Sequence, residues 1–191
     1  MSKLLRIYIK SVEKHPYLTQ CTTAGALTAL GDCFAQHLFS TDKYDYTRTL
    51  KFAAIGTFYF GPICTGWLRF LSSKLEHKPM AMMAVDQVLA APLITVGFLA
   101  IFTKMNGLNN FESIETIKNE FWGIQTKSWP FWMSVQAINF RFMPLAYRVL
   151  FIQVASILWN TYLSWKASSA VKIEEVVVRV EDLELKHDKL D

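Results

Sequence analysis

The sequence predicts an all-α fold, a polytopic membrane helix bundle with four transmembrane helices plus amphipathic interfacial helices. Three observations predict this class, and the first two concern composition. Of the residues, 52% are hydrophobic, and only 19% are charged, against about 25% in a typical soluble domain. The third concerns distribution, because four intervals carry no charge, between residues 15 and 32, 51 and 69, 86 and 104, and 148 and 166. Each approaches the roughly 20 residues that cross a bilayer core. A soluble protein of this length has too little polar helix surface to cover four such helices.

The first predicted region is a basic amphipathic N-terminal helix at residues 1–16. Its basic residues recur at helical spacing on one face: Lys3, Arg6, Lys10 and Lys14. Such a helix is suited to lie on a membrane that carries anionic lipids, and its acid-poor character is typical of mitochondrial targeting segments. A solvated cap before the first crossing is the alternative reading.

The second predicted region is the four-span membrane domain, residues 17–166. Its first three crossings are expected at about 17–39, 50–71 and 82–102, each an apolar interval between polar loops. The connection that follows, 104–127, has apolar residues spaced for one helical face. We expect it to lie on the membrane as an amphipathic helix.

The fourth crossing falls between residues 129 and 165, a stretch too long for one straight helix across a bilayer. Two courses remain open: a crossing at about 132–151 with an interfacial continuation, or a crossing at about 144–163 preceded by a segment in the interface. Helix kinks are expected at three prolines, because proline lacks the N–H of a helical hydrogen bond: Pro62, Pro92 and Pro144. The third region, 167–191, is predicted to be a charged soluble tail, helical or disordered.

Polar residues inside these apolar stretches are the candidate functional residues. A charged side chain at the bilayer centre costs about 2.5–3.5 kcal/mol on insertion scales, so each one requires a reason. The candidate pore-lining or polar-cluster residues are Asp32, Gln36, Asp86, Gln87, Gln136, Asn139, Arg141 and Arg148. The carboxylates and arginines are expected to pair or to line a water-filled path. Hydrogen bonding between helices, without any path, is the alternative.

The sequence gives no sign of an enzyme. Its four histidines are scattered without metal-ligand spacing, and it has no Gly-rich phosphate loop, nucleophile elbow or paired-cysteine motif. We therefore expect no catalytic residue, no metal and no cofactor. The three cysteines lie in apolar stretches and argue against a disulfide framework; a redox-sensitive pair of Cys21 and Cys33 is the minority reading.

Several motifs carry a resemblance to a known family. They are "GDCFAQ", "DYTRTLKFAAIGTFYFGP", "DQVLAAP", "WPFWMSVQAINFRFMPLAYR" and "WNTYLSW". Together they resemble the Mpv-seventeen family of small four-span membrane proteins, which includes the twenty-two-kilodalton peroxisomal membrane protein. The resemblance covers about residues 4–166. One departure concerns the second crossing, where family members often have a histidine and then Trp-Tyr, whereas Thr65 and Trp67-Leu68 occupy that region here.

The resemblance implies an integral organelle-membrane protein, most often of the mitochondrial inner membrane, that forms a weakly selective channel for small solutes. It also implies a link to membrane potential, nucleotide-pool homeostasis and mitochondrial DNA maintenance. The positions that match the polar motifs of the family are Gly31, Asp32, Gln36, Asp86, Gln87, Pro92, Trp129, Pro130, Gln136, Asn139, Pro144 and Arg148.

Two alternatives stay open beside the mitochondrial channel. One is a non-conducting membrane organiser, whose basic helix and acidic tail recruit partners, and the other is a channel of the peroxisomal membrane. The partners expected are the lipid bilayer with its anionic lipids, small solutes or ions, and further copies of the chain in a homo-oligomer. Direct nucleic-acid binding is not expected, because the sequence has no basic stripe with a groove-reading helix.

Overall fold

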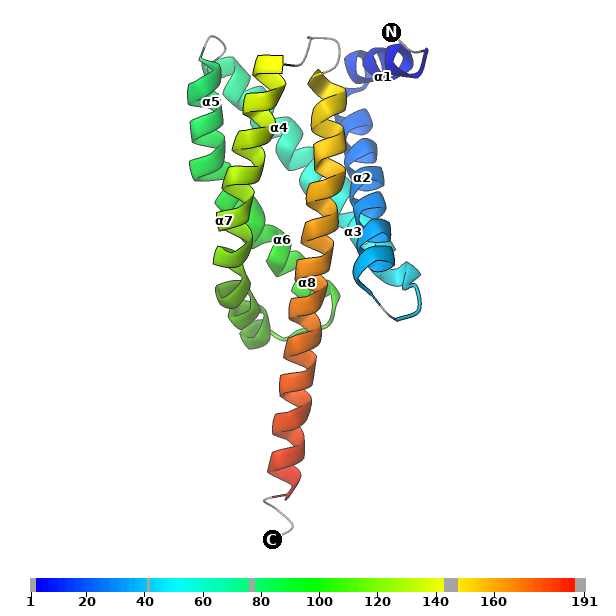
Figure 1. Cartoon of the computed structure of the whole chain (residues 1–191), viewed down its shortest axis with the longest axis vertical. Helices are drawn as coiled ribbons and strands as arrows, with labels where there is room; N and C mark the ends of the chain where they lie inside the picture. The colour runs from blue at the N-terminus through cyan, green and yellow to red at the C-terminus, as the bar shows by residue number, and fades with distance from the viewer. Residues whose placement is uncertain (1–2, 41, 76–77, 143–147, 188–191) are drawn as a thin grey trace.

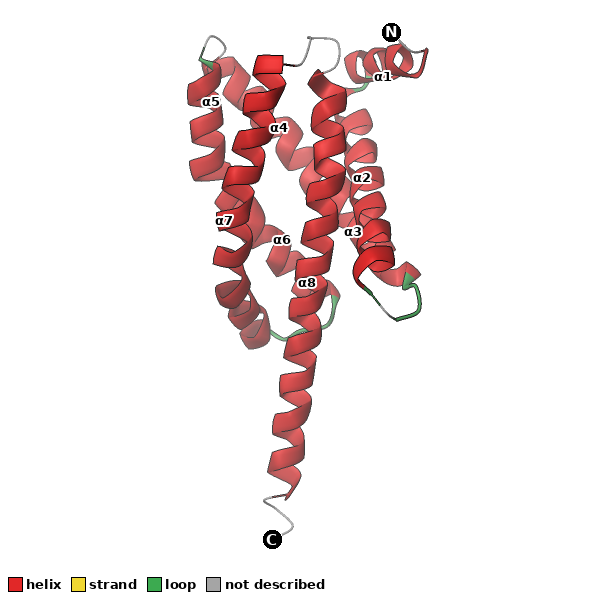
Figure 2. Ribbon diagram, viewed as in Figure 1, coloured by secondary structure: helices red, strands yellow, loops and turns green. Residues whose placement is uncertain are grey.

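The computed structural model describes residues 3–40, 42–75, 78–142 and 148–187, and every regular element in these ranges is a helix (Figure 2). The predicted all-α class is therefore confirmed. In chain order the elements are α1 (Lys3–Lys14), α2 (Pro16–Phe39), α3 (Tyr46–Ile55), η1 (Gly56–Phe60), α4 (Gly61–Leu75), α5 (Pro79–Val85), η2 (Asp86–Ala90), α6 (Ala91–Met105), α7 (Asn110–Phe142) and α8 (Arg148–His187).

Within the described ranges, five helical legs run along the bundle: α2, then α3–η1–α4, then α5–η2–α6, then α7, then α8. Figure 1 shows successive legs running in opposite directions, with α1 lying across the end at which α2 begins. We call that end of the bundle the amino end. At the opposite end, the tail end, α8 continues well beyond the other helices, so the two termini lie at opposite ends of the molecule.

The course of the chain after the third leg differs from the expected one. The segment 104–127 was expected to lie on the membrane, but most of it is the first half of α7, which packs lengthwise between α6 and α8. Ile124 and Gln125 are fully buried in this packing. Because α7 ends at Phe142 and α8 begins at Arg148 as a separate leg, the helix expected at about 132–151 is not present. The alternative crossing at about 144–163 falls largely within α8, but it follows the leg α7 and not an interfacial segment. Pro144 lies outside the described residues.

The second and third legs each contain one turn of π-helix directly before a Gly-Pro or Ala-Pro pair. The Gly61 N–H donates to the Gly56 carbonyl, and the Ala91 N–H donates to the Asp86 carbonyl, each reaching back five residues. The next residue in each leg is a proline, which supplies no N–H and crowds the preceding turn. The wider turns accommodate the two prolines without ending either leg.

The hydrophobic core lies toward the tail end, where α3, α6, α7 and α8 meet. Its centre is a group of phenylalanine rings, in which Phe52 lies 5.0 Å from Phe102 and 6.2 Å from Phe98 between ring centroids. The bundle is held closely at the crossing of α2 and α8, because a Cβ added at Gly31 would lie 2.5 Å from the Cβ of Asn160. Contacts this short require glycine, so Gly31 sets the spacing of these two helices.

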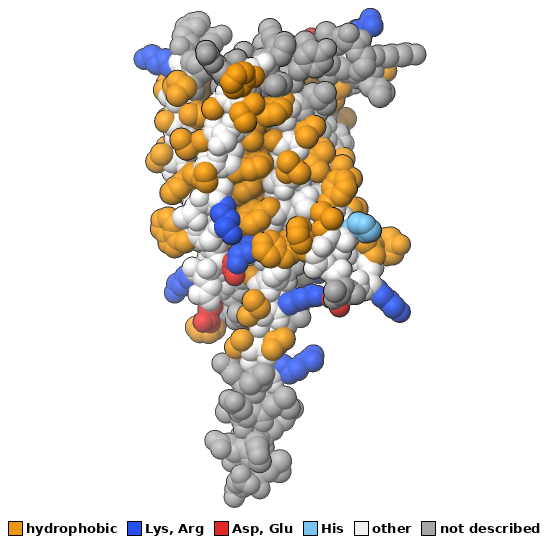
Figure 3. All heavy atoms as spheres, in the orientation of Figure 1, with side chains coloured by type: hydrophobic (Ala, Val, Ile, Leu, Met, Phe, Trp, Pro, Cys, Tyr) orange, Lys and Arg blue, Asp and Glu red, His pale blue; other side chains and the backbone are white. Residues whose placement is uncertain are grey.

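The outer surface carries a broad apolar belt. Figure 3 shows hydrophobic side chains over the upper and middle parts of the visible face, with charged side chains gathered toward the tail end. The most exposed apolar side chains of the belt include Phe58 at 81% and Leu93 at 72%. By length and apolar content, one helical run in the described residues qualifies as a membrane crossing, Met80–Met105. The expected four crossings are therefore not confirmed.

Candidate functional site

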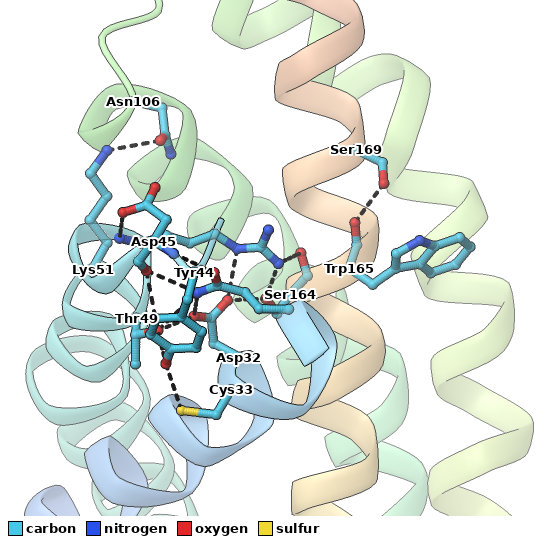
Figure 4. A network of polar contacts seen from close by, with 12 residues as sticks. Asp32, Cys33, Tyr44, Asp45, Thr49, Lys51, Asn106, Ser164, Trp165 and Ser169 are labelled. Carbon is cyan, nitrogen blue, oxygen red and sulfur yellow. Dashed lines mark hydrogen bonds and ion pairs between the residues drawn. The ribbon is translucent and has the colours of Figure 1, made fainter. Parts of the chain in front are cut away.

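A completely buried carboxylate, that of Asp32, organises the tail-end half of the bundle. Its Oδ1 accepts from Arg48 Nε at 2.8 Å and from Ser164 Oγ at 2.5 Å, and its Oδ2 accepts from Gln36 Nε2 at 2.8 Å and from Thr49 Oγ1 at 2.5 Å (Figure 4). These partners come from α2, α3 and α8. The five residues are called the Asp32 cluster below, and they join three legs at one point.

Local structure explains why Arg48 reaches Asp32. Asp45 caps α3, since its Oδ1 accepts from the Arg48 N–H at 3.0 Å, and its backbone exchanges two hydrogen bonds with the Gln36 carboxamide. The cap fixes the start of α3 against the end of α2. The Arg48 guanidinium then lies between Asp32 and α8, and its Nη2 also donates to Ser164 Oγ at 2.9 Å.

The sequence singled out Asp32 and Gln36 but considered different cationic partners. Arg141 and Arg148 were expected near the carboxylates, yet the ion pair of Asp32 is with Arg48 at 2.8 Å. The side chains of Asn139, Arg141 and Arg148 lie outside the described part of the structure. Arg48, Thr49 and Ser164 were missed because they belong to segments that read as a polar loop or as ordinary helix surface. The available signal was Asp45, a residue type typical of a helix N-cap, which could have marked the start of α3 but not the contact of Arg48 with Asp32.

A chain of hydrogen bonds extends from the Asp32 cluster to the surface. Thr49 Oγ1 and the Tyr44 hydroxyl lie 2.7 Å apart, and the Tyr44 hydroxyl lies 2.9 Å from Cys33 Sγ. Desolvation and the neighbouring Cys33 raise the pKa of Tyr44 above its ordinary value of 10. The three cysteines are free, and Cys21 and Cys33, considered as a redox-sensitive pair, lie about 18 Å apart along α2 and are not brought together.

A cavity of about 490 Å³ occupies the other half of the bundle, toward the amino end. Its volume lies in the range of small-molecule sites, about 300–1,000 Å³. Residues of every leg line it, together with Tyr8 of α1. Three of the predicted site residues are among them: Asp86, Gln87 and Gln136.

Asp86 is the charged group of this cavity. Its Oδ1 accepts from Trp67 Nε1 and its Oδ2 from Gln87 Nε2, both at 2.9 Å, and Trp129 Nε1 fixes the adjacent backbone by donating to the Gln87 carbonyl at 2.9 Å. Two buried side-chain oxygens of the cavity wall, Gln87 Oε1 and Gln136 Oε1, have no hydrogen-bond partner. The wall therefore presents a carboxylate and two unoccupied acceptors.

The cavity and the Asp32 cluster follow one another along the bundle. Thr28 and Leu163 line the cavity, and the next residues along the same helices toward the tail end are those of the cluster, with Asp32 one turn beyond Thr28 and Ser164 directly after Leu163. The cluster thus stands between the cavity and the tail end. The hydrophobic core of α3, α6, α7 and α8 lies beside the cluster at the same end of the cavity.

No group of three His, Cys, Asp or Glu side chains in the described residues is placed to hold a metal ion. The carboxylates of Asp32 and Asp86, with their hydrogen-bonding neighbours, can bind a solute reversibly through hydrogen bonds and charge. The ionic contacts of the Asp32 cluster can also break and re-form without covalent change.

Comparison with known proteins decides the family. The model of the Mpv17 / PMP22 family matches residues 103–164. The chain is 34% identical over 175 residues to the mitochondrial inner membrane protein Mpv17 of Danio rerio, an alignment that covers 88% of this chain and 99% of that protein. This chain belongs to the Mpv17 / PMP22 family.

Other members of the family give the same result. Protein SYM1 of Saccharomyces cerevisiae is 34% identical over 189 residues, covering 92% of this chain and 96% of that protein. The mitochondrial inner membrane protein Mpv17 of Caenorhabditis briggsae is 32% identical over 170 residues, covering 87% and 94%. These relatives locate the Mpv17 / PMP22 member described here in the mitochondrial inner membrane, as expected from the resemblance. No solved structure matches the chain.

Proposed function

We propose that this protein is a weakly selective, non-enzymatic channel for small solutes of the mitochondrial inner membrane. The observation that carries the proposal is the cavity of about 490 Å³ between the five legs, whose wall combines aromatic rings with a carboxylate and carboxamides. A bundle that served only as a scaffold would lower its free energy by filling a void of this size with side chains. The exposed apolar belt supports a position of the legs across the bilayer, and the basic α1 is suited to lie against anionic headgroups.

The Asp32 cluster is proposed to be the closure of this channel. Its contacts are ionic and hydrogen-bonded, so they can be exchanged for water when the legs move, whereas a closely packed apolar plug cannot be hydrated at comparable cost. In the closed arrangement Arg48 and Ser164 tie α3 and α8 to Asp32 of α2. When the channel opens, α8 separates from α2 and α3 at the position of the Asp32 cluster. The proposal includes support of membrane potential, nucleotide-pool homeostasis and mitochondrial DNA maintenance, as consequences of the solutes that pass.

Cys64 provides a direct test, because its side chain lines the cavity. In a variant that keeps Cys64 but carries Cys21→Ser and Cys33→Ser, we expect methanethiosulfonate ethylammonium to reduce single-channel current in planar bilayers. The thiol reacts as thiolate and so requires access to water, and the attached group then narrows the path. The matched control is the variant that also carries Cys64→Ser, whose current should not change.

Two results would contradict the proposal. Well-folded protein that inserts into bilayers and never conducts, at any voltage, would exclude a channel. Modification of Cys64 verified by mass spectrometry with no change in current would exclude the cavity as the conducting path.

A second candidate function, a non-conducting membrane organiser, is favoured by one observation: the Asp32 cluster joins α2, α3 and α8 as structural hydrogen bonding would. In this case Asp32→Asn lowers the yield of folded protein, and neither the wild type nor the variant conducts. The bilayer recordings therefore separate the two functions.

A further inference from the structure

Asp86 is a partly buried carboxylate that forms no ion pair with any residue of the described part of the chain. Ion pairs in the described residues involve Asp32, Asp42 and Glu120, and none involves Asp86. No lysine, arginine or histidine is among the described residues that line the cavity. An unpaired carboxylate removed from water is unfavourable, and a stabilising cation would have to come from outside this set of residues.

The remaining polar groups of the wall also require a donor. Gln87 Oε1 and Gln136 Oε1 are buried acceptors without a partner, while the Gln87 amide nitrogen is already used in its bond to Asp86. A buried acceptor left unsatisfied costs about 1–3 kcal/mol. Carboxylate and carbonyl oxygens together select a group that has several N–H donors and a positive charge.

The rest of the wall is suited to the body of such a ligand. Indole rings of Trp67, Trp132 and Trp159 line the cavity, together with Phe60 and Phe98. Indole faces attract organic cations through the ring quadrupole, and they bury apolar surface at the same time. The arrangement of several aromatic rings around one carboxylate is unfavourable for anions, because it offers them no compensating charge.

We propose that the cavity binds a small organic ammonium ion, with its ammonium group at Asp86 and its apolar part against the tryptophans. The site is part of the proposed channel, so the inference deepens that function by naming the class of solute that binds within it. Asp86 pairs with the cation, and Gln87 and Gln136 accept hydrogen bonds from its N–H groups. Uncharged analogues bind less tightly, and organic anions are excluded.

Three probes of one shape test this selectivity: phenethylammonium, 2-phenylethanol and phenylacetate. We expect isothermal titration of the purified protein in detergent to give an affinity order of cation, then alcohol, then anion. Asp86→Asn keeps the shape of the side chain and removes its charge. It should weaken binding of phenethylammonium by about tenfold or more and leave 2-phenylethanol unchanged, because the alcohol carries no charge. The matched control is Asp42→Asn, at an exposed loop residue outside the cavity.

Equal binding of the cation and the anion by the wild type would overturn the inference, whether or not the variant folds. An unchanged preference for the cation in folded Asp86→Asn would overturn the assigned role of Asp86. The titration requires no conduction, so its failure is distinct from failure of the channel. A protein that binds phenethylammonium but passes no current would retain this site and lose the proposed function.

Discussion

At the scale of single residues, Asp32 is the position on which the proposed closure depends. Its side chain is completely buried, and Arg48 is 16% exposed. Removing one member of a buried ion pair leaves the other charged and unpaired, at a cost of about 3–5 kcal/mol. We expect Asp32→Ala to lower the free energy of unfolding by about this amount, measured by chemical denaturation in detergent.

A double-mutant cycle with Arg48→Ala is the control for this prediction. Because both residues act in one contact, the double variant should be less destabilised than the sum of the two single variants. Additive effects would contradict the pairing of Asp32 with Arg48.

The contact of Asp42 with Lys172, at the surface of the tail end, gives a pH-dependent prediction. The Lys172 ammonium, by its hydrogen bond and its charge, lowers the pKa of Asp42 below the ordinary value of 3.8. A lowered folded-state pKa means that the contact stabilises the structure above pH of about 3.8 and is lost as the pH falls through the lowered pKa. The protection of amide hydrogens near Lys172, relative to their intrinsic exchange rate at each pH, should therefore fall in that acid range.

Asp42→Asn is the comparison for the acid transition, since asparagine does not titrate. At neutral pH this variant should show lower protection of the amide hydrogens near Lys172 than the wild type. Its protection should not fall further in the acid range. The same acid transition in both proteins would exclude Asp42 as its cause.

Whether the sequence alone can identify a residue of the candidate site depends on the residues around it in the chain. Asp32, Gln36 and Asp86 could be singled out because a polar side chain within an apolar interval requires a reason. Arg48 could not, since an arginine in a polar segment is ordinary, and its pairing with Asp32 exists only once α2 and α3 are packed together. Ser164 likewise has no local signal, because its partner lies 132 residues away in the chain.

At the scale of elements, the close crossing of α2 and α8 rests on Gly31. A Cβ there would lie 2.5 Å from the Cβ of Asn160 and 2.8 Å and 2.9 Å from backbone atoms of Asn160 and Thr161. The backbone atoms cannot move aside as a flexible side chain would. We expect Gly31→Ala to separate the two helices and to lower the free energy of unfolding by about 1–3 kcal/mol, as overpacking does, measured by denaturation.

Gly66 in α4 is the matched control, because nothing lies within 4 Å of a Cβ built there. Alanine favours helix over glycine by about 1 kcal/mol, so Gly66→Ala should be neutral or stabilising. Equal destabilisation by both substitutions would show that the close crossing is not the cause.

The elements also show where local patterns are insufficient. The helical spacing of the apolar residues in 104–127 predicts a helix, and most of this segment is indeed the first part of α7. The spacing cannot show whether the apolar face packs on a bilayer surface or on the faces of α6 and α8. Polar residues that would mark an interfacial helix are buried here, as in the case of Gln125, which accepts a hydrogen bond from Thr95 at 3.2 Å. The kinks expected at Pro62 and Pro92 stay a prediction, and the π-turns that directly precede these prolines carry no signal in one sequence.

At the scale of the whole molecule, five legs place the two termini at opposite ends of the bundle, whereas four crossings would place them on one side. With epitope tags at both ends, we expect protease added to mitochondria with ruptured outer membranes to remove one tag and leave the other. Digestion of both tags, or protection of both, would contradict this topology. Protection of both tags in mitochondria with intact outer membranes and digestion of both after detergent are the controls.

The cavity is a property of the whole molecule that the sequence did not predict. Its lining residues come from every leg and from α1, so no local segment contains a sign of its volume. The sequence did predict that polar faces would meet inside the bundle. It could not predict that they divide into an open cavity at Asp86 and a closed cluster at Asp32, since that division depends on side chains such as Arg48 and Ser164 that only the fold brings together.

Single-channel recording of Asp32→Asn beside the wild type, in planar bilayers, tests the central claim most directly. The substitution keeps the shape of the side chain and removes the charge that holds Arg48 across the path. We predict discrete currents from both proteins, with a several-fold higher open probability in the variant and a similar current through each open channel, because the cavity is unchanged. A folded variant with the same open probability as the wild type would contradict the claim that the Asp32 cluster closes the channel.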